Sequence, residues 1–270
     1  MFQYSGRGEV VVVVPVYTET LTADEQISVA ALQRHLSAYD VVLLVPDTLR
    51  RPPISAHAVA FDCEYFSGTA AYSRLLLSSE FYRVFSRYRY MLIYQLDALV
   101  FSDQLAHWCS KGYDYIGAPV HVHSDDQSAA FVGNGGFSLR KLESFLHVLE
   151  GSESPPSSIE ACRRIASAPS PDVEALPGLQ RISKTLSIAR QISQGVQTYA
   201  GSYTLNEDLF WSLRAPYFTS SFRRPSVDEA ARFSIDKHPE YWLRRTDGAL
   251  PFGCHAWAKY DRDLWERHLS

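Results

Sequence analysis

The chain has 270 residues, 46% of them hydrophobic, so it can bury a large core within one domain. Its 26 Lys and Arg residues nearly balance 30 Asp and Glu residues, which argues against a nucleic-acid partner or an anionic membrane bound through a global basic field. The longest apolar run spans residues 10–16, whereas a membrane-spanning helix needs about 20. Four cysteines without CxxC spacing, and an N-terminus without a signal pattern, predict reduced thiols and a cytoplasmic location.

Strand and helix patterns alternate along the first part of the chain, as is typical of an α/β fold. The β-branched run Val10–Val16 predicts a strand that is buried on both faces. Thr22, with Glu25 three residues later, forms a capping-box pattern that predicts the start of a helix. We therefore expect a single domain over 1–270, built on a mixed, mainly parallel central sheet flanked by helices. Further predicted elements are a strand over 41–45, a helix over about 71–85 and a strand over 90–96.

One region is predicted to lie outside this sheet. Residues 151–172 are rich in Ser, Pro and Glu, which indicates a surface flap or linker. Residues 179–196 carry apolar side chains at helical spacing, including Ile182 and Leu186. We predict a flap and helical insertion over about 151–200, whose apolar face contacts the main fold, a partner or a membrane surface.

Asp97 follows the predicted strand 90–96 directly, at the edge of a parallel sheet where ligands bind. A carboxylate among apolar residues needs a compensating partner. That partner is either the backbone of the turn, which Asp97 would cap, or a divalent cation such as Mg²⁺ or Mn²⁺ that bridges a diphosphate. His255, in the aromatic segment 251–257, is either a core histidine or a second ligand of that cation.

Two other segments combine polar and flexible residues. The loop 133–136, with Asn134, either forms an ordinary tight turn or presses its backbone against a sugar ring. Glu207 and Asp208 either complement the dipole of a helix start or supply a general base for an acceptor hydroxyl. A lower-ranked polar cluster consists of His121, His123, Asp125 and Asp126.

Seven segments, taken in order, resemble the GT-A glycosyltransferases and, more closely, a bacterial family of unknown function that is described as glycosyltransferase-like. They span about residues 10–260 without the region around 151–200. The resemblance implies a GT-A-like, Rossmann-like fold and transfer of a sugar from a nucleotide-sugar, with a UDP-sugar as the expected donor. It also implies a glycan or glycolipid acceptor in bacterial polysaccharide or glycoconjugate biosynthesis. The segments are VVVVPVYTE, YSRLLLSSEFYRVF, YQLDALVFSD, DYIGAP, GNGGFSLR, NEDLFW and PFGCHAW.

The resemblance further implies roles for single residues. A DxD motif ends a central strand in GT-A enzymes, and the matching triplet here is Gln95-Leu96-Asp97. Asp97 would bind Mn²⁺ or Mg²⁺ together with His255, whereas neutral Gln95 departs from the motif. Asp208 would be the base of an inverting reaction, with Glu207 beside it. The nucleotide would contact Pro15, Val16, Tyr17, Thr18, Arg74, Gln95 and Asp97, and the sugar or acceptor would contact Asn134, Gly135, Gly136 and Asn206.

Two other function classes stay open. A sugar nucleotidyltransferase shares the α/β layout, but the segment after the first strand reads PVYTET and lacks the glycine-rich, basic character that cradles a triphosphate. Gln95 favours a degenerate scaffold that binds a sugar or nucleotide without catalysis, whereas the joint presence of Asp97, Asp208 and His255 favours an enzyme. With a lipid-linked acceptor, the cytoplasmic location would extend to the inner-membrane surface. The oligomeric state is not predicted.

Overall fold

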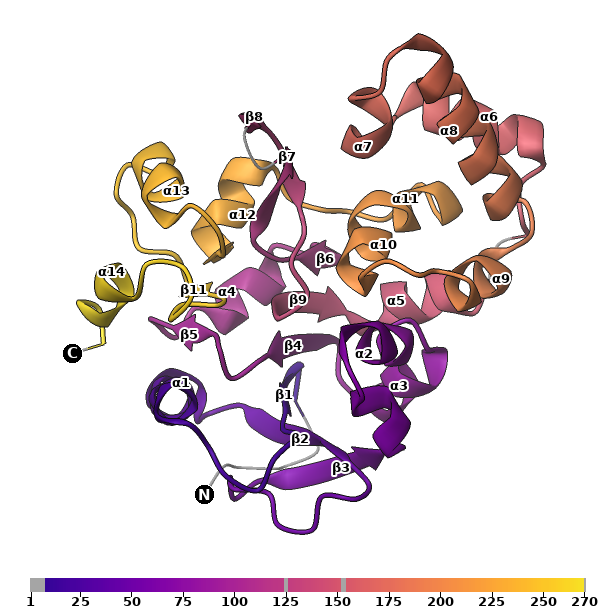
Figure 1. Ribbon diagram of the computed structural model, residues 1–270. Coiled ribbons are helices and arrows are strands. Elements are labelled where there is room, and N and C mark those ends of the chain that lie inside the picture. The colour runs from indigo at the N-terminus through magenta and orange to yellow at the C-terminus, as the bar shows by residue number, and fades with distance from the viewer. Residues whose placement is uncertain (1–7, 124–125, 152–153, 270) are drawn as a thin grey trace.

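A six-stranded sheet lies at the centre of the protein (Figure 1). The structure is a computed structural model that describes residues 8–123, 126–151 and 154–269. The first four strands in the list below pair in parallel, and the fifth runs antiparallel to both of its neighbours. This arrangement confirms the predicted class, a mixed and mainly parallel α/β sheet flanked by helices. In spatial order the strands are β3 (His57–Phe61), β2 (Asp40–Pro46), β1 (Val10–Pro15), β4 (Tyr90–Tyr94), β9 (Phe137–Lys141) and β6 (Tyr115–Ile116).

Strand β1 and helix α1 (Ala23–Leu36) have the ends that the sequence predicts, and a loop at the edge of the sheet connects them. Every residue of β1 is buried, which explains its unbroken apolar sequence. The predicted capping box is present: the Glu25 amide donates to Thr22 Oγ1 at 3.3 Å, and the Thr22 amide donates to Glu25 Oε2 at 2.7 Å. Because the helix start is fixed in this way, residues 16–21 form a loop at the carboxyl end of β1.

The predicted helix over 71–85 is wrong, because two shorter helices occupy this segment. Helix α2 (Thr69–Leu75) and helix α3 (Ser79–Val84) are separated at Ser78, whose backbone is extended with φ −96° and ψ 130°. Leu76 and Leu77 in the break are 0% and 7% exposed. The apolar periodicity therefore runs across the break and hides it from the sequence.

Side chains of the sheet alternate between two hydrophobic clusters, one on each face. Val11 and Val13 of β1 point into the first cluster, and Val12 and Val14 point into the second. The first face is covered by α2, α3, α5 (Leu142–Leu149) and α10 (Glu207–Leu213). The second face is covered by α1, α4 (Leu105–Ser110) and a small sheet of β10 (Ser234–Ile235), β11 (Gly253–Cys254) and β5 (Leu99–Val100).

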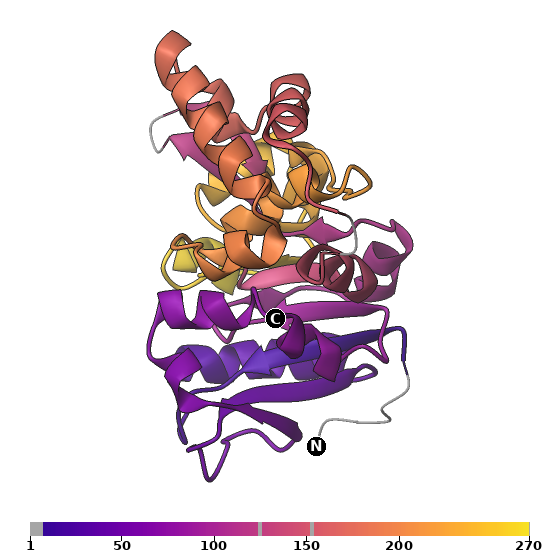
Figure 2. The same cartoon turned by 90° about the vertical axis from the view of Figure 1, so that its right-hand side faces the viewer.

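Four helices fill the region predicted as a flap and helical insertion, and they stand at the end of the molecule opposite the N-terminal strands (Figure 2). Most of the described residues between 151 and 172 are helical, and Ala161 and Ile165 are 0% exposed, so their role as a flap or linker remains a prediction. The helix expected over 179–196 ends at Ile192. That this region is an insertion remains a prediction. The helices are α6 (Ser158–Ser167), α7 (Pro171–Glu174), α8 (Gly178–Ile192) and α9 (Val196–Gly201).

Shorter elements complete the fold around the sheet. Within the described ranges, no helix combines the length and the apolar character that crossing a bilayer requires. The remaining elements are the 3₁₀ helix η1 (Cys63–Phe66), the hairpin of β7 (Pro119–His123) and β8 (Asp126–Val132), and the helices α11 (Ala215–Phe218), α12 (Val227–Phe233), α13 (Pro239–Arg245) and α14 (Arg262–Glu266).

Candidate active site

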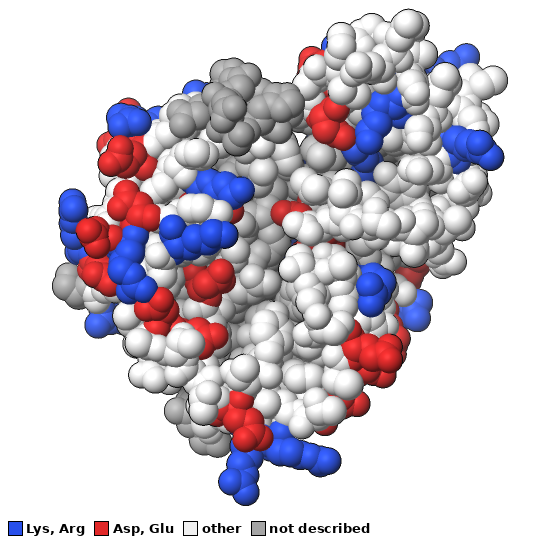
Figure 3. Space-filling model, in the orientation of Figure 1, with Lys and Arg blue, Asp and Glu red and all other residues white. Residues whose placement is uncertain are grey.

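A cavity of about 440 Å³ opens at the carboxyl ends of β1 and β4. The face of the molecule in Figure 3 is hollowed near its centre, and side chains of both charges lie around the hollow. Arg74, which was also predicted to contact a nucleotide, is exposed on α2 and is not part of the cavity lining. The other residues predicted to contact the nucleotide all line this cavity: Pro15, Val16, Tyr17, Thr18, Gln95 and Asp97.

His255 lies behind two lining residues of this cavity, Gln95 and Asp97, and between two carboxylates. Its Nε2 atom is 3.1 Å from Asp97 Oδ1 and 3.1 Å from the amide oxygen of Gln95. Its Nδ1 atom is 3.6 Å from Asp236 Oδ1. Burial by itself would lower the pKa of His255, but the hydrogen bonds and charges of Asp236 and Asp97 raise that pKa to about 9. The structure thus brings together the residues predicted to bind a metal.

Asp236 was missed by the sequence analysis. Strand β10 pairs in parallel with β11, with Ile235 opposite Cys254, so the next residues along the two strands, Asp236 and His255, are neighbours. The signal in the sequence was weak, because a single acid after the apolar segment of residues 233–235 resembles any strand end. A carboxylate that contacts the far nitrogen of a metal-binding histidine fixes the tautomer and the orientation of the ring.

The loop 133–136 separates this histidine from a second group of polar residues. A Cβ atom on Gly136 would lie 2.0 Å from His255 Nε2, and one on Gly135 would lie 2.4 Å from Glu207 Oε1. Both glycines therefore let side chains of the site approach the backbone, and the contact of this loop with a sugar stays a prediction.

Asn134 organises the same loop through its side chain. Its backbone has a φ of 64°, and its Oδ1 atom accepts hydrogen bonds from the amides of Gly136 and Phe137 at 3.1 and 3.2 Å. Its Nδ2 atom donates to Asp236 Oδ2 at 3.0 Å. The Asn134 amide is thus engaged within the protein rather than open to a sugar hydroxyl.

Glu207 forms a buried ion pair with Arg140, which the sequence analysis did not single out. The side chain of Arg140 is 0% exposed, and its Nη2 atom lies 2.7 Å from Glu207 Oε1. Arg140 also donates to the Tyr82 hydroxyl at 2.8 Å and to the carbonyl of Gly135 at 3.3 Å. Because both charges are buried and hydrogen-bonded, they hold the start of α10 against the glycine loop.

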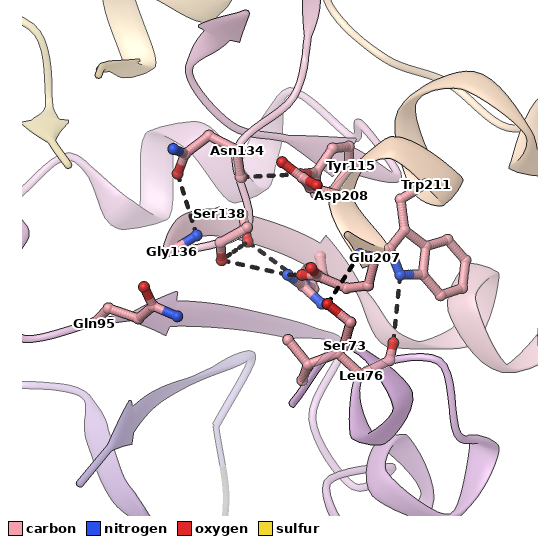
Figure 4. A network of polar contacts seen from close by, with 12 residues as sticks. Ser73, Leu76, Gln95, Tyr115, Asn134, Gly136, Ser138, Glu207, Asp208 and Trp211 are labelled. Carbon is pink, nitrogen blue, oxygen red and sulfur yellow. Dashed lines mark hydrogen bonds and ion pairs between the residues drawn. The ribbon is translucent and has the colours of Figure 1, made fainter. Parts of the chain in front are cut away.

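Asp208, the next residue, forms no ion pair with any residue in the described ranges. Its Oδ1 atom accepts a hydrogen bond from the Leu209 amide at 2.8 Å, and the backbone of Asn134 supplies another (Figure 4). Burial, together with the negative charge of Glu207, raises the pKa of Asp208 to about 7. A carboxyl group with this pKa can accept a proton near neutral pH. Asn206, which precedes the two acids, is exposed at the N-terminus of α10 and makes no side-chain cap.

The predicted metal ligands provide a partial donor set. Among the residues that the structure describes, no group of three or more His, Cys, Asp or Glu side chains is arranged to hold a metal ion. Asp97, Gln95 and His255 nevertheless place a carboxylate, an amide oxygen and an imidazole nitrogen around one point, and the Asp97 side chain is 55% exposed. Such a set suits Mg²⁺ or Mn²⁺ when phosphate oxygens and water complete the coordination.

The lower-ranked polar cluster contributes little to this site. Asp125 lies outside the described residues, as do the side chains of His123 and Asp126. The ring of His121 stacks on that of Trp242, with a centroid distance of 5.2 Å. This contact places His121 among aromatic residues.

Several solved glycosyltransferase structures are distantly similar to this chain. Galactosyltransferase LgtC, in complex with donor and acceptor sugar analogs, is 11% identical with a TM-score of 0.43, and the match covers 96% of this chain and 95% of that chain. Glycosyltransferase GlyE of Streptococcus pneumoniae TIGR4 is 11% identical with a TM-score of 0.42, and the match covers 97% of this chain and 60% of that chain. Core-mannan synthase A of Aspergillus fumigatus, in its Mn/GDP form, is 12% identical with a TM-score of 0.37, and the match covers 76% of this chain and 72% of that chain.

A comparison with curated protein sequences finds no match. One family model, described as "Protein of unknown function (DUF5672)", matches residues 55–255. This match covers more than half of the 270 residues. The chain therefore belongs to the DUF5672 family.

Proposed function

We propose that this protein is a glycosyltransferase that moves a sugar from a nucleoside diphosphate to an acceptor hydroxyl. One observation carries the proposal: Asp208, a half-buried carboxyl group with a pKa of about 7, lies across a glycine loop from His255, which contacts Asp97 in the wall of the open cavity. A general base beside a site for a charged leaving group is what glycosyl transfer to a hydroxyl requires.

The cavity at the ends of β1 and β4 suits a nucleotide. Tyr17 is 48% exposed, and its ring packs against Phe66 and Tyr72 with centroid distances of 5.6 and 6.3 Å. An exposed ring held from behind offers a stacking surface for a base. Lys259 also lines the cavity and favours the ionised form of Asp97, so a positive charge is available for a diphosphate.

Asp97 and His255, with the amide oxygen of Gln95, would hold Mn²⁺ or Mg²⁺ when the diphosphate supplies the remaining oxygen ligands. When bound, the cation neutralises the charge that develops on the leaving nucleoside diphosphate. Gln95 departs from the DxD motif because it carries no negative charge. Its neutral amide can still contribute an oxygen ligand to the cation.

Asp208 is the proposed base of a single, inverting displacement. Its carboxylate takes the proton of the acceptor hydroxyl as that oxygen attacks the anomeric carbon, and the bond to the diphosphate breaks. Glu207 is unsuited to this role because its carboxylate is bonded to Arg140. We assign Glu207 to positioning α10 and to raising the pKa of its neighbour.

The proposal includes a glycan or glycolipid acceptor and a peripheral contact with a membrane surface. Leu179, Ile182 and Leu186 of α8 are 84%, 57% and 58% exposed, and this helix contains no acidic residue. A helix with an apolar stripe and basic neighbours binds anionic lipid surfaces. Co-sedimentation with anionic vesicles would support this contact, and recovery of all the protein in the supernatant would refute it.

One observation favours a second function, a degenerate nucleotide- or sugar-binding scaffold. Asp97 is the one carboxylate of the Gln95-Leu96-Asp97 triplet, so the affinity for a cation is lower than with the two carboxylates of a DxD motif. A transfer and donor-hydrolysis screen with nucleotide-sugars, run on the wild type and on Asp208→Asn, separates the two functions. The glycosyltransferase predicts a wild-type product that the variant forms at a rate lower by about 10²–10⁴-fold while still binding the nucleotide. Nucleotide binding without any turnover in the wild type would favour the scaffold.

A further inference from the structure

A second cavity, of about 560 Å³, lies between α6, α10 and α11 and is separate from the one at the ends of β1 and β4. Arg164 and Arg224 line it together with one acid, Glu160, and several serines. The two guanidinium groups give the lining a net positive charge. Nothing in the proposed chemistry at Asp97, His255 or Asp208 uses this cavity.

Arg224 is the unusual member of this lining. It is partly buried, yet it makes no hydrogen bond or ion pair with any residue in the part of the chain that the structure describes. Burial lowers the pKa of Arg224, and the one ionisable group that opposes this effect is the Tyr217 phenol. A partly desolvated charge without a counter-ion costs folding free energy, and an anionic ligand would supply that counter-ion.

Ser212 is a second unpartnered group in the same wall. It is 0% exposed, and its Oγ atom has no hydrogen-bond partner among the described residues. Buried hydroxyl groups are normally hydrogen-bonded, so the Ser212 hydroxyl is an unused polar group in this wall. Among the described residues, Arg164 makes two long contacts, 3.5 Å from Nε to Glu160 Oε1 and 3.3 Å from Nη1 to the carbonyl of Tyr217, so other donors of its guanidinium have no partner there.

The wall of the cavity is held rigidly. The Tyr217 hydroxyl accepts a hydrogen bond from the Ser170 amide at 2.7 Å and donates to the Ala168 carbonyl at 3.2 Å. Arg214 forms an ion pair with Asp172 next to these residues. These contacts hold Ser170 and Tyr217 in the wall that they share with Arg164 and Arg224.

The position of this cavity relates it to the proposed base. Ser212 follows Asp208 by four residues on α10, so both lie on one side of the helix with their Cβ atoms about 6 Å apart. We infer that this cavity binds an anionic group, a phosphate or a carboxylate, on the acceptor whose hydroxyl Asp208 deprotonates. The acceptor role rests on the proposed function, whereas binding of the anion itself does not.

Calorimetric titration of the full chain with inorganic phosphate, in EDTA to exclude metal-bound phosphate, tests the anion site. We expect binding to the wild type, weakened by about tenfold or more in Arg224→Gln. Arg163→Gln is the matched control, because Arg163 lies on the same helix as Arg164 with a side chain that is 76% exposed and outside the cavity lining. Equal phosphate binding by all three proteins, or none by the wild type, would overturn the inference.

Two further measurements distinguish the possible failures. Because Arg224 carries an unpaired charge, Arg224→Gln should keep or raise the Tm measured without phosphate, so that lost binding is not lost folding; a lower Tm would contradict the unpaired state. Nucleotide binding at the first cavity should be the same in Arg224→Gln and the wild type. If phosphate binding depends on Arg224 while no nucleotide binds, the proposed function fails and the anion site stands.

Kinetic measurements with a panel of acceptors test whether the anion site takes part in sugar transfer. Acceptors with a phosphate or a carboxylate should have a lower KM than their neutral counterparts, and Arg224→Gln should remove this preference without a matching loss in kcat. Titration with acetate beside phosphate shows which of the two anions the site prefers. An equal KM for charged and neutral acceptors would refute the acceptor role.

Discussion

Arg140 Nη2 and Glu207 Oε1 lie 2.7 Å apart in the interior of the protein, and this ion pair distinguishes Glu207 from the adjacent acid Asp208. Glu207 is bound to its arginine, whereas Asp208 accepts backbone hydrogen bonds and forms no ion pair with a residue that the structure describes. The raised pKa of Asp208 follows from burial and from this unequal sharing. A catalytic assignment based on the Glu-Asp sequence alone could not have separated the two residues.

Breaking the Arg140–Glu207 pair should destabilise the fold strongly. Glu207→Gln leaves a buried guanidinium without its counter-ion, and we expect the free energy of unfolding to fall by about 3–5 kcal/mol. Chemical denaturation measures this change. Glu150→Gln is the control, because the Arg83–Glu150 pair is exposed and its loss should cost less than about 1 kcal/mol. Equal losses in the two variants would show that the buried pair has no special role.

The pKa of Asp208 predicts a pH dependence of stability. Its folded-state value of about 7 lies above the ordinary value of 3.8, so between these limits the folded protein binds more protons at this site than the unfolded chain. The Asp208 contribution to the free energy of unfolding therefore falls as the pH rises from about 4 to about 7. Asp208→Asn removes this titration, so the variant should gain stability relative to the wild type over that window. A constant difference between the two proteins would contradict the raised pKa.

Catalysis should show the same group. Asp208 must be ionised in the free enzyme to accept a proton. We therefore expect log(kcat/KM) to fall with decreasing pH below about 7. A pH series of initial rates with a fixed donor and acceptor measures this profile. A profile that stays level from pH 5 to 8, under conditions where chemistry limits the rate, would exclude Asp208 as the base.

The glycine loop predicts a sharp contrast between two conservative changes. Gly136→Ala would place a Cβ atom 2.0 Å from His255 Nε2 and 2.6 Å from the Gln95 amide oxygen, so these side chains must move. We expect metal-dependent nucleotide binding to be lost. Gly201→Ala, in α9, meets no atom within 4 Å and should bind as the wild type does. Unchanged binding in Gly136→Ala would show that His255 and Gln95 are not used.

Asp236 should support the metal site without binding the metal. Asp236→Asn weakens the contact that orients the far nitrogen of His255, and we expect the affinity for Mn²⁺ to fall by about 10–100-fold. Electron paramagnetic resonance of free Mn²⁺ measures this affinity in the presence of a nucleoside diphosphate. Asp247→Asn changes a carboxylate that is 94% exposed and serves as the control. An unchanged affinity in Asp236→Asn would remove Asp236 from the site.

The elements that the sequence predicted well are those with a strong local signal. The β-branched run of β1 and the capping box of Thr22 and Glu25 each depend on neighbouring residues, and both are present in the structure. The break between α2 and α3 was missed because Leu76 and Leu77 continue the apolar pattern while the backbone changes direction. Periodicity reports burial, and it does not report the backbone angles at a single serine.

The candidate site depends on contacts between segments that are distant in the sequence, which explains why some of its residues were not predicted. Arg140 lies inside a buried strand that the sequence did not predict, so both its need for an acid and the identity of Glu207 as that acid come only from the fold. Asp236 reaches His255 through the pairing of two strands of two residues each, which are too short to predict. The residues predicted for the cavity came from the segments that resemble GT-A enzymes.

The measurement that tests the central claim most directly is a thermal-shift and calorimetric panel of UDP, GDP, CMP and dTDP. Each nucleotide is added with and without Mn²⁺ to the wild type and to Asp97→Ala. Because a ligand that binds only the folded state raises its apparent stability, the panel needs no knowledge of the acceptor. We predict that one nucleotide raises the Tm of the wild type and that the rise requires both Mn²⁺ and Asp97. If no nucleotide raises the Tm of the wild type under any of these conditions, the protein is not a nucleotide-sugar-dependent glycosyltransferase.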